Sequence, residues 1–360
     1  MNITLKHLLL FAALSSAAVL FVTRPALSGP PNNDINLLEL STDIADLAAK
    51  VSKGTVFLSV RRNDGRTTGF GRGTGFVVDA IQGTVVTNAH VVEDAPSAIV
   101  QFADGRRVTA TVLGVDKKTD LAVLDIPAGA SRFQLDWGNS DALRPGNLVM
   151  AVGSPLGLNG TTSLGVVSAL GRKLELVDDS YEDFIQFDAF IDRGSSGGPL
   201  VNMAGEVIGI NTAIGGGDGR SEPMWRGIGY AIPTAIAKRY VADLATLGHV
   251  RRGFIGISAN GYDAQHAELL GLDHLYGVTV VSVQKGGPAD QAGITVNDVI
   301  LEIQGREITS AMQVKTRIAA LEPGSTAKVK LLSNRAFRTV RVTIGLRDNA
   351  EDDSSDASGG

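Results

Sequence analysis

The sequence contains no cysteine, which excludes disulfide bonds and thiol chemistry from all 360 residues. It also lacks an HExxH motif, a Cys/His cluster and a phosphate-binding glycine loop. Metal and nucleotide chemistry therefore have no support in the sequence. We expect neither a metal site nor a cofactor.

An excess of basic charge is missing too, because the net charge is −5. Residues 348–360 hold five acidic residues and no basic one, so the remainder of the chain is neutral. Since nucleic-acid-binding proteins present a basic surface, we expect no nucleic-acid partner. The acidic tail, residues 347–360, has little apolar surface to bury and is predicted to be disordered.

A hydrophobic run at residues 8–22 follows Lys6 and is shorter than the roughly 20 residues that span a membrane. Ala26-Leu27-Ser28 after it forms a small-x-small cleavage site. Residues 1–28 are therefore either a cleaved signal peptide or an anchor retained in the inner membrane. Both alternatives place the remainder outside the cytoplasm. The absence of cysteine favours the bacterial periplasm over an animal secretory route, where disulfides are usual.

The hydrophobic pattern then changes twice along the chain. Residues 29–40 are rich in proline and asparagine and are predicted to be a linker, followed by a helix that Ser41 caps. Short β-like runs follow at close spacing up to residue 232, which is typical of a sandwich or barrel. A helix with one apolar face comes next and ends at Gly248. We predict a first, mainly β domain at residues 41–248.

A smaller α+β domain is predicted at residues 253–346. It opens with a strand at residues 254–257 and continues with further apolar runs. Ser310 and Gln313 form a capping-box pattern that predicts the start of a helix. Alternating apolar residues after this helix predict the closing strands.

Three short segments carry residues suited to nucleophilic catalysis. His90 is the only histidine in residues 29–248, Asp120 lies in TDLAVL, and a serine pair lies in GSSGGP at residues 194–199. A serine hydroxyl becomes a good nucleophile only when a base accepts its proton and a further group orients that base. The glycines also let backbone N–H groups converge on an oxyanion. A lone histidine and a glycine turn can be purely structural, but the three segments together favour a Ser-His-Asp triad.

The segments TNAHVV, TDLAVL and GSSGGPLVN resemble the catalytic segments of the HtrA (Deg) family of trypsin-fold serine proteases. The resemblance covers most of residues 41–346 in order. It implies a mainly β fold, with a chymotrypsin-like double β-barrel protease domain followed by one small α+β PDZ domain. Further similar segments are VMAVGSPLGL, VVSALGR, YEDFIQFDAFIDRG, GINTAI and GIGYAIP.

The resemblance also implies a role for each candidate catalytic residue. Ser196, which precedes the paired glycines, would be the nucleophile. His90 would be the general base, and Asp120 would hold the tautomer of that base. Backbone N–H groups of Gly194 and Ser196 would form the oxyanion hole. Ser195 replaces the family's usual asparagine, and we expect little loss because its backbone is the part that contributes.

Two further departures lie just before the nucleophile. Asp192 stands where the family often has asparagine, and Phe190 stands where a small residue is usual. Phe190 and Ile191 are expected to belong to the specificity pocket, where the aromatic ring would favour small apolar P1 residues. In the alternative, the Phe190 ring turns into the barrel core.

The second domain begins with RGFIGI, which resembles the carboxylate-binding loop of HtrA-family PDZ domains. Phe254, Ile255, Gly256 and Ile257 would accept the C-terminus of a peptide that adds as a strand. C-terminal peptides of misfolded envelope proteins are the expected partners, beside protein substrates. The helix at residues 310–321 would wall the groove.

The combination of one PDZ domain and an N-terminal hydrophobic segment is similar to the DegS-like stress-sensor proteases. This resemblance implies restraint by the PDZ domain until a peptide binds, a relay through Arg172, and a homotrimer. A general quality-control protease and chaperone is the alternative. A non-catalytic peptide-binding protein is the minor one.

Overall fold

The structure is a computed structural model that describes residues 36–63, 68–154, 160–174, 180–214, 227–262 and 276–347. The predicted signal or anchor at residues 1–28, its apolar run at residues 8–22, and residues 348–360 of the predicted tail lie outside the described residues. Among the residues that are described, no helix combines the length and the apolar character needed to cross a membrane. The chain divides into a short unit, residues 1–42, and a large unit, residues 43–360.

Helix α1 (Leu37–Gly54) starts earlier than the sequence predicted. The Asn36 side-chain oxygen accepts hydrogen bonds from the N–H groups of Leu38 (3.1 Å) and Glu39 (3.3 Å). Asn36 therefore caps the helix, and Ser41 lies inside it. The predicted linker at residues 29–40 is wrong in its last residues, because the Asn36 side chain caps the helix and residues 37–40 are already helical.

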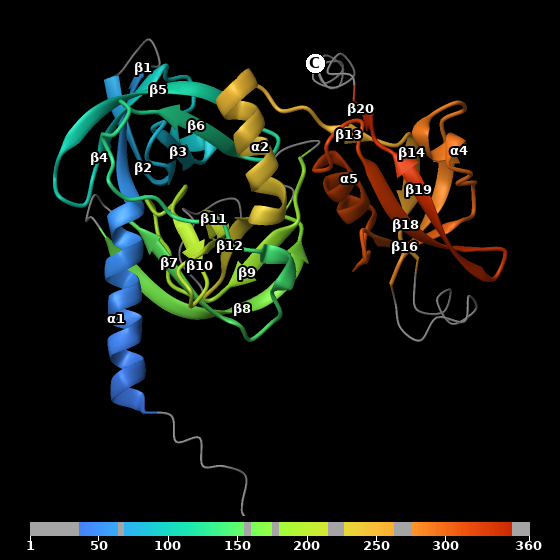
Figure 1. Cartoon of the computed structure of the whole chain (residues 1–360), viewed down its shortest axis with the longest axis horizontal. Helices are drawn as coiled ribbons and strands as arrows, with labels where there is room; N and C mark the ends of the chain where they lie inside the picture. Colours follow the sequence, from blue (N-terminus) through green and yellow to red (C-terminus); the bar gives the residue numbers. More distant parts are fainter. Residues whose placement is uncertain are drawn as a thin grey trace, which may run out of the picture. The chain divides into compact units, whose positions relative to one another are not determined.

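The first six strands of the large unit close into a barrel in the order β1-β2-β3-β6-β5-β4 (Figure 1). Strands β4 and β5 pair across a hairpin turn at residues 104–105, where Gly105 has a φ of 85°. The strands are β1 (Thr55–Asn63), β2 (Thr68–Asp79), β3 (Thr84–Thr87), β4 (Ser97–Gln101), β5 (Arg107–Asp116) and β6 (Leu121–Asp125).

A second closed barrel follows in the order β10-β11-β12-β9-β8-β7. Helix α2 (Thr234–Leu247) ends at Gly248, whose φ of 77° confirms the predicted glycine cap. It packs against β5 and β6 of the first barrel and β11 and β12 of the second. The strands are β7 (Leu148–Gly153), β8 (Thr161–Arg172), β9 (Phe184–Phe187), β10 (Pro199–Val201), β11 (Val207–Ile214) and β12 (Gly229–Pro233).

The remaining described residues form a small domain with a sheet in the order β14-β15-β16-β18-β19, to which β17 adds beside β16, and a separate pair, β13 and β20. The Ser310 hydroxyl accepts the Gln313 N–H (3.2 Å), which confirms the predicted helix cap. The elements are β13 (Gly253–Phe254), β14 (Ile257–Asn260), β15 (Val278–Val283), α4 (Pro288–Gln291), β16 (Val299–Ile303), β17 (Arg306–Glu307), α5 (Ala311–Ala319), β18 (Thr326–Ser333), β19 (Ala336–Thr343) and β20 (Gly345–Leu346).

Two sequence predictions need correction in this domain. The strand expected at residues 254–257 is broken, because Gly256 has a φ of 75° and Ile255 is buried in the core. A left-handed residue cannot continue an extended strand. Arg347 is not part of the predicted disordered tail, since its N–H donates to the Arg252 carbonyl (2.9 Å).

A buried ion pair joins the start of this domain to the first barrel. The Arg252 guanidinium lies 2.6 Å from Asp116 Oδ1, and both side chains are less than a tenth exposed. Its carbon also lies 4.4 Å from the centre of the Tyr181 ring and 5.7 Å from that of Tyr240. Thr119 donates to the same Asp116 carboxylate. Asp116 therefore has its charge matched and its oxygens bonded, which a buried carboxylate requires.

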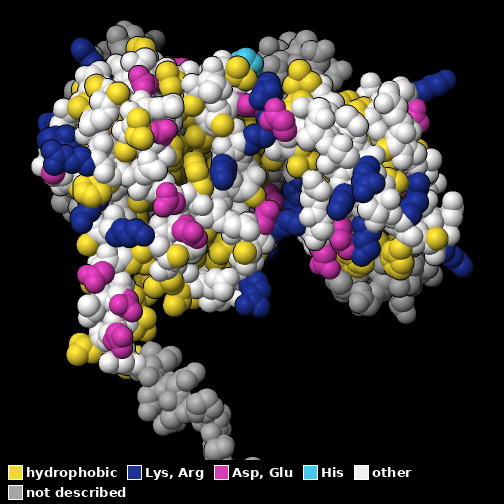
Figure 2. All heavy atoms as spheres, in the orientation of Figure 1, with side chains coloured by type: hydrophobic (Ala, Val, Ile, Leu, Met, Phe, Trp, Pro, Cys, Tyr) yellow, Lys and Arg dark blue, Asp and Glu magenta, His cyan; other side chains and the backbone are white. Residues whose placement is uncertain are grey.

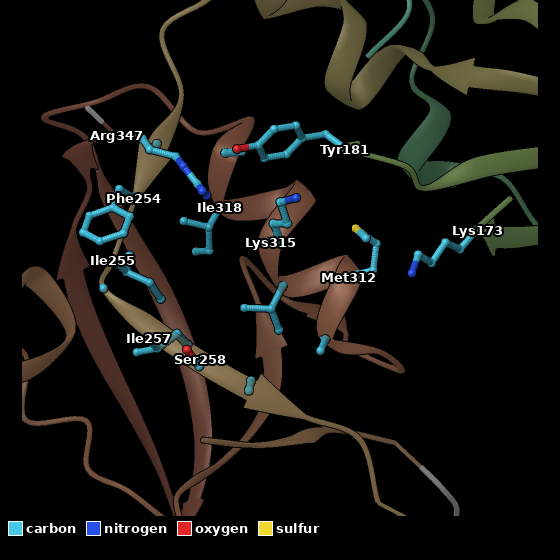
Figure 3. Close-up of a pocket in the computed structure, with 16 residues that line it drawn as sticks. Lys173, Tyr181, Phe254, Ile255, Ile257, Ser258, Met312, Lys315, Ile318 and Arg347 are labelled. Carbon is cyan, nitrogen blue, oxygen red and sulfur yellow. The ribbon is translucent and has the colours of Figure 1, made fainter. Parts of the chain in front are cut away.

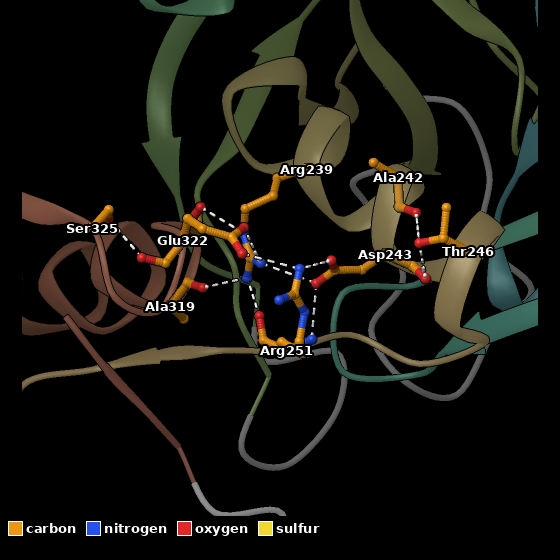
Figure 4. A network of polar contacts seen from close by, with 9 residues as sticks. Arg239, Ala242, Asp243, Thr246, Arg251, Ala319, Glu322 and Ser325 are labelled. Carbon is orange, nitrogen blue, oxygen red and sulfur yellow. Dashed lines mark hydrogen bonds and ion pairs between the residues drawn. The ribbon is translucent and has the colours of Figure 1, made fainter.

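A second polar network links α2 to Glu322 (Figure 4). Asp243 is 4% exposed and accepts hydrogen bonds from Arg239 (2.9 Å) and Arg251 (2.7 Å). Arg239 also donates to the Ala320 carbonyl (2.9 Å) beyond the end of α5.

On the surface shown in Figure 2, acidic and basic side chains are interspersed.

We predict that Arg252→Ala lowers the free energy of unfolding by about 3–5 kcal/mol, because it leaves the Asp116 charge buried without its partner. The matched control is Arg106→Ala, which breaks the pair with Asp104, where both side chains are more than half exposed. That change should cost far less, because water screens an exposed ion pair. Urea unfolding of both variants measures the difference. Equal losses would contradict the importance of the buried pair.

Candidate active site

His90 and Asp120 meet because β3 and β6 are antiparallel neighbours. Thr87, the last residue of β3, pairs with Ala122 near the start of β6, so residues after β3 and before β6 share one edge of the barrel. His90 lies there in a short 3-10 helix, Ala89–Val91. Its Nδ1 is 2.9 Å from both carboxylate oxygens of Asp120, and its backbone N–H donates to Oδ1 (3.0 Å).

The Asp120 backbone is held in an uncommon conformation. Its φ is 56°, in the left-handed region, which costs a non-glycine residue about 1–3 kcal/mol. The fully buried Asn88 donates to the Asp120 carbonyl (2.8 Å), and the Asp120 N–H donates to Lys117 O (3.3 Å). These bonds fix the carboxylate where His90 can reach it.

Thr212 on β11 connects the two barrels at the site. Its hydroxyl donates to Asp120 Oδ2 (2.5 Å), while its carbonyl lies 3.5 Å from the Ser196 hydroxyl. Sequence reasoning missed Thr212. Its segment, GINTAI, carries a signal, since a polar Asn-Thr pair interrupts an otherwise apolar strand.

The two serines of GSSGGP occupy different surroundings. Ser195 is buried, and its hydroxyl accepts the Asp192 N–H (3.3 Å), whereas Ser196 is half-buried. Tight turns hold the loop, with Ser195 N–H donating to Asp192 O (2.8 Å). Gly197 has a φ of 83°, and a Cβ there would lie 2.2 Å from the Thr74 carbonyl, so no other residue fits.

The two residues expected at the specificity pocket differ in burial. Phe190 is 45% exposed, so the alternative that its ring packs in the barrel core is wrong. Its carbonyl accepts the Ser163 hydroxyl (2.5 Å) from β8. Ile191 is buried in the core of the second barrel.

The four residues expected at the carboxylate-binding loop, Phe254, Ile255, Gly256 and Ile257, line a groove of about 470 Å³ (Figure 3). Helix α5 provides the opposite wall. Lys173 and Tyr181, from the segments around β8 and β9, also face the groove. Arg172, the proposed relay, is exposed and donates to the Gln186 side chain (2.8 Å).

Helix α5 also contacts the segment that precedes β9. Lys315 donates to the Ser180 carbonyl (3.2 Å), and Thr316 donates to the Glu182 carbonyl (3.2 Å). Burial raises the pKa of the Asp183 carboxyl, an effect that Arg317 and Gln313 of α5 oppose. Within the described part of the chain, no group of three or more His, Asp or Glu side chains is arranged to hold a metal ion.

Comparison with known proteins places these features in one family. Residues 73–210 match the trypsin-like peptidase domain, and residues 253–344 match the PDZ domain. The DegP-like probable periplasmic serine endoprotease of Chlamydia muridarum is 44% identical over 274 residues, which are 76% of this chain and 54% of that protein. The periplasmic pH-dependent serine endoprotease DegQ of Escherichia coli is 40% identical over 275 residues, 76% of this chain and 59% of DegQ.

The chain thus spans little more than half the length of these curated relatives. A solved structure of the HtrA-type protease AlgW with a tripeptide matches nearly throughout. It is 34% identical with a TM-score of 0.64, over 84% of this chain and 97% of that one. With two closed barrels, a PDZ domain and this similarity, the chain belongs to the HtrA family of trypsin-like serine proteases.

Proposed function

We propose that the protein is a serine endopeptidase of the bacterial periplasm that uses Ser196, His90 and Asp120. The observation that carries this proposal is the Asp120 carboxylate, which lies 2.9 Å from His90 Nδ1 and accepts the Thr212 hydroxyl. A carboxylate at Nδ1 holds the proton there and leaves Nε2 as the basic nitrogen.

In the proposed reaction, His90 Nε2 accepts the Ser196 proton as Oγ attacks the peptide carbonyl carbon. The N–H groups of Gly194 and Ser196 stabilise the resulting oxyanion. His90 then gives the proton to the leaving amine, the C–N bond breaks, and an acyl-enzyme ester remains. Water, deprotonated by His90, then attacks the ester carbonyl carbon. The bond to Ser196 Oγ breaks, His90 returns the proton to Oγ, and the second product leaves as a carboxylic acid.

Substrate preference would follow from Phe190 and Ile191. The exposed Phe190 ring can occupy volume at the mouth of a P1 pocket, and the buried Ile191 would line its apolar wall. We therefore expect small apolar P1 residues. Enlarging this site by Phe190→Ala would shift the preference toward larger apolar ones.

The groove supports regulation by C-terminal peptides. Ile257, Val314 and Ile318 give it an apolar lining, and Lys315 and Arg347 add positive charge that favours a carboxylate. A peptide would add as a strand beside β14. AlgW, whose structure was solved with a tripeptide, gives this proposal a precedent.

Contacts between the groove and the triad give such a peptide a route to the active site. Tyr181 lines the groove, and its N–H donates to Lys118 O (2.9 Å), in the turn that leads to Asp120. Arg172 would serve as a relay. These contacts favour a DegS-like envelope stress sensor, which we further propose to be a homotrimer and to be anchored in the inner membrane unless residues 1–28 are cleaved.

A general quality-control protease is the second candidate. Its support is the similarity to proteins named DegP-like and DegQ. The two candidates differ in whether unfolded proteins are digested without a peptide signal.

The nucleophile assignment predicts that Ser196→Ala abolishes casein cleavage, a loss of about 10⁴-fold or more. Ser195→Ala should keep most activity, because its hydroxyl accepts a backbone N–H instead of facing the triad. Casein digestion by the purified variants measures both. Inactivation by Ser195→Ala with retention in Ser196→Ala would reverse the assignment.

Thr212→Val should lower kcat about 10- to 100-fold with little change in KM. The substitution removes a hydrogen bond to a charged carboxylate, worth about 1.5–3 kcal/mol, without changing the side chain's shape. Thr246→Val, which removes a hydroxyl bonded only to α2 carbonyls, is the control. Equal kcat values for both variants would show that Asp120 is oriented without Thr212.

Peptides with a free apolar C-terminus should raise the rate of casein cleavage, and the same peptides with an amidated C-terminus should not. A tenfold rise requires about 1.4 kcal/mol of preferential binding to the active conformation. Arg172→Ala should reduce the rise without weakening peptide binding, which fluorescence anisotropy measures. Rapid casein digestion that no peptide alters would favour the general quality-control protease.

A further inference from the structure

Thr74 on β2 is a fully buried polar residue that bonds to three separate segments. Its hydroxyl donates to Gly194 O (2.6 Å) and accepts the Ser154 N–H (2.9 Å). Its backbone N–H donates to Ser196 O (2.9 Å), and its carbonyl accepts the Thr87 hydroxyl (2.7 Å). We infer that Thr74 is a positioning residue for peptide-bond hydrolysis, an inference that rests on the function proposed above.

The two carbonyls held by Thr74 belong to the Gly194–Ser195 and Ser196–Gly197 peptide groups, which alternate with the two peptide groups whose N–H groups we assign to the oxyanion hole. Gly194 has a φ of 95°, a region in which glycine has little steric restriction. Oxyanion stabilisation depends on donors that are oriented before the reaction, and a carbonyl turned toward the hole would repel the negative charge. A carbonyl fixes the plane of its own peptide group, whose N–H belongs to the next residue. By bonding the Gly194 carbonyl, Thr74 fixes the peptide group that lies between the two donor peptides and so limits the rotation of the Gly194 and Ser196 N–H groups away from the substrate oxygen.

The same residue fixes the nucleophile loop relative to the base. Thr87, which donates to Thr74 O, ends the strand that leads to His90. Gly197 packs at this point, since a Cβ on it would lie 2.2 Å from both Thr74 O and Thr87 Oγ1. Thr74 therefore holds the Ser196 loop of the second barrel against the His90 strand of the first.

The hydroxyl can be tested separately from the backbone and the bulk of Thr74. Valine has nearly the same shape and keeps the N–H bond to Ser196, but it loses the bonds to Gly194 and Ser154. Serine keeps the hydroxyl and loses only the methyl group. The comparison of Thr74→Val with Thr74→Ser therefore isolates one donor and one acceptor.

In the full-length protein, Thr74→Val should lower kcat about 10- to 100-fold at nearly constant KM, and Thr74→Ser should stay within about threefold of the wild type. Affinity for a peptidyl boronic acid, whose tetrahedral adduct places an oxygen in the oxyanion hole, should fall by the same factor as kcat. Binding of the matching unmodified peptide to a Ser196→Ala background should not change. A merely structural role would leave the kinetics and the boronate affinity unaltered.

Thr55→Val is the control, because Thr55 is also a buried threonine and donates to Val51 O (3.0 Å) away from the site. It should reduce stability and leave kcat unchanged.

Wild-type kcat and boronate affinity in Thr74→Val would overturn the inference, as would an equal loss in Thr74→Ser. If Thr74→Val fails to fold, Thr74→Ala and Thr74→Ser decide instead, since they differ only by the hydroxyl. Failure of the proposed function would look different, with wild type and Ser196→Ala equally inactive.

Discussion

The candidate site depends on the register between two closed barrels, because His90 and Asp120 come from one barrel and Ser196 from the other. Two threonines, one from each barrel, fix this register. Thr212 reaches from the second barrel to the Asp120 carboxylate, and Thr74 reaches from the first barrel to the loop around Ser196. Both bonds are partly buried, so water competes with them only weakly.

Apolar packing supports these polar contacts. The largest core cluster includes residues of both barrels and of α2, so the barrels share a core in addition to the cluster that each barrel buries within itself. Close-packed protein interiors resist small displacements of their side chains. The strained φ of Asp120 can persist only in such surroundings, because a looser site would relax it. Members of the shared core include Phe76, Val86, Leu121, Met150, Val152, Ile210, Tyr240 and Leu244.

The strand pattern predicted a sandwich or barrel, and the family resemblance implied the double barrel and the roles of the candidate residues, but neither predicted the contacts that hold these residues together. The separation of His90 and Asp120 along the chain carries no information about distance, and their meeting follows from the β3–β6 pairing. Thr74 and Thr212 were not predicted, because threonine is common in strands and the role of its hydroxyl depends on its hydrogen-bond partner in the folded structure. The helix begins after Asn36 instead of at Ser41, and the expected strand is interrupted at Gly256. Caps and turns are difficult to predict because each depends on single residues whose alternatives differ little in free energy.

The position of the groove supports the proposal that a peptide bound there affects the active site. Tyr181 and Lys173, which belong to the protease barrels, face the groove beside residues of α5. A peptide in the groove therefore touches both domains, and its binding energy depends on how they meet. Only such a dependence lets a ligand shift a conformational equilibrium. The Tyr181 ring also stacks on Arg252, so a peptide that moves Tyr181 disturbs the buried pair with Asp116 and the turn that ends at Asp120.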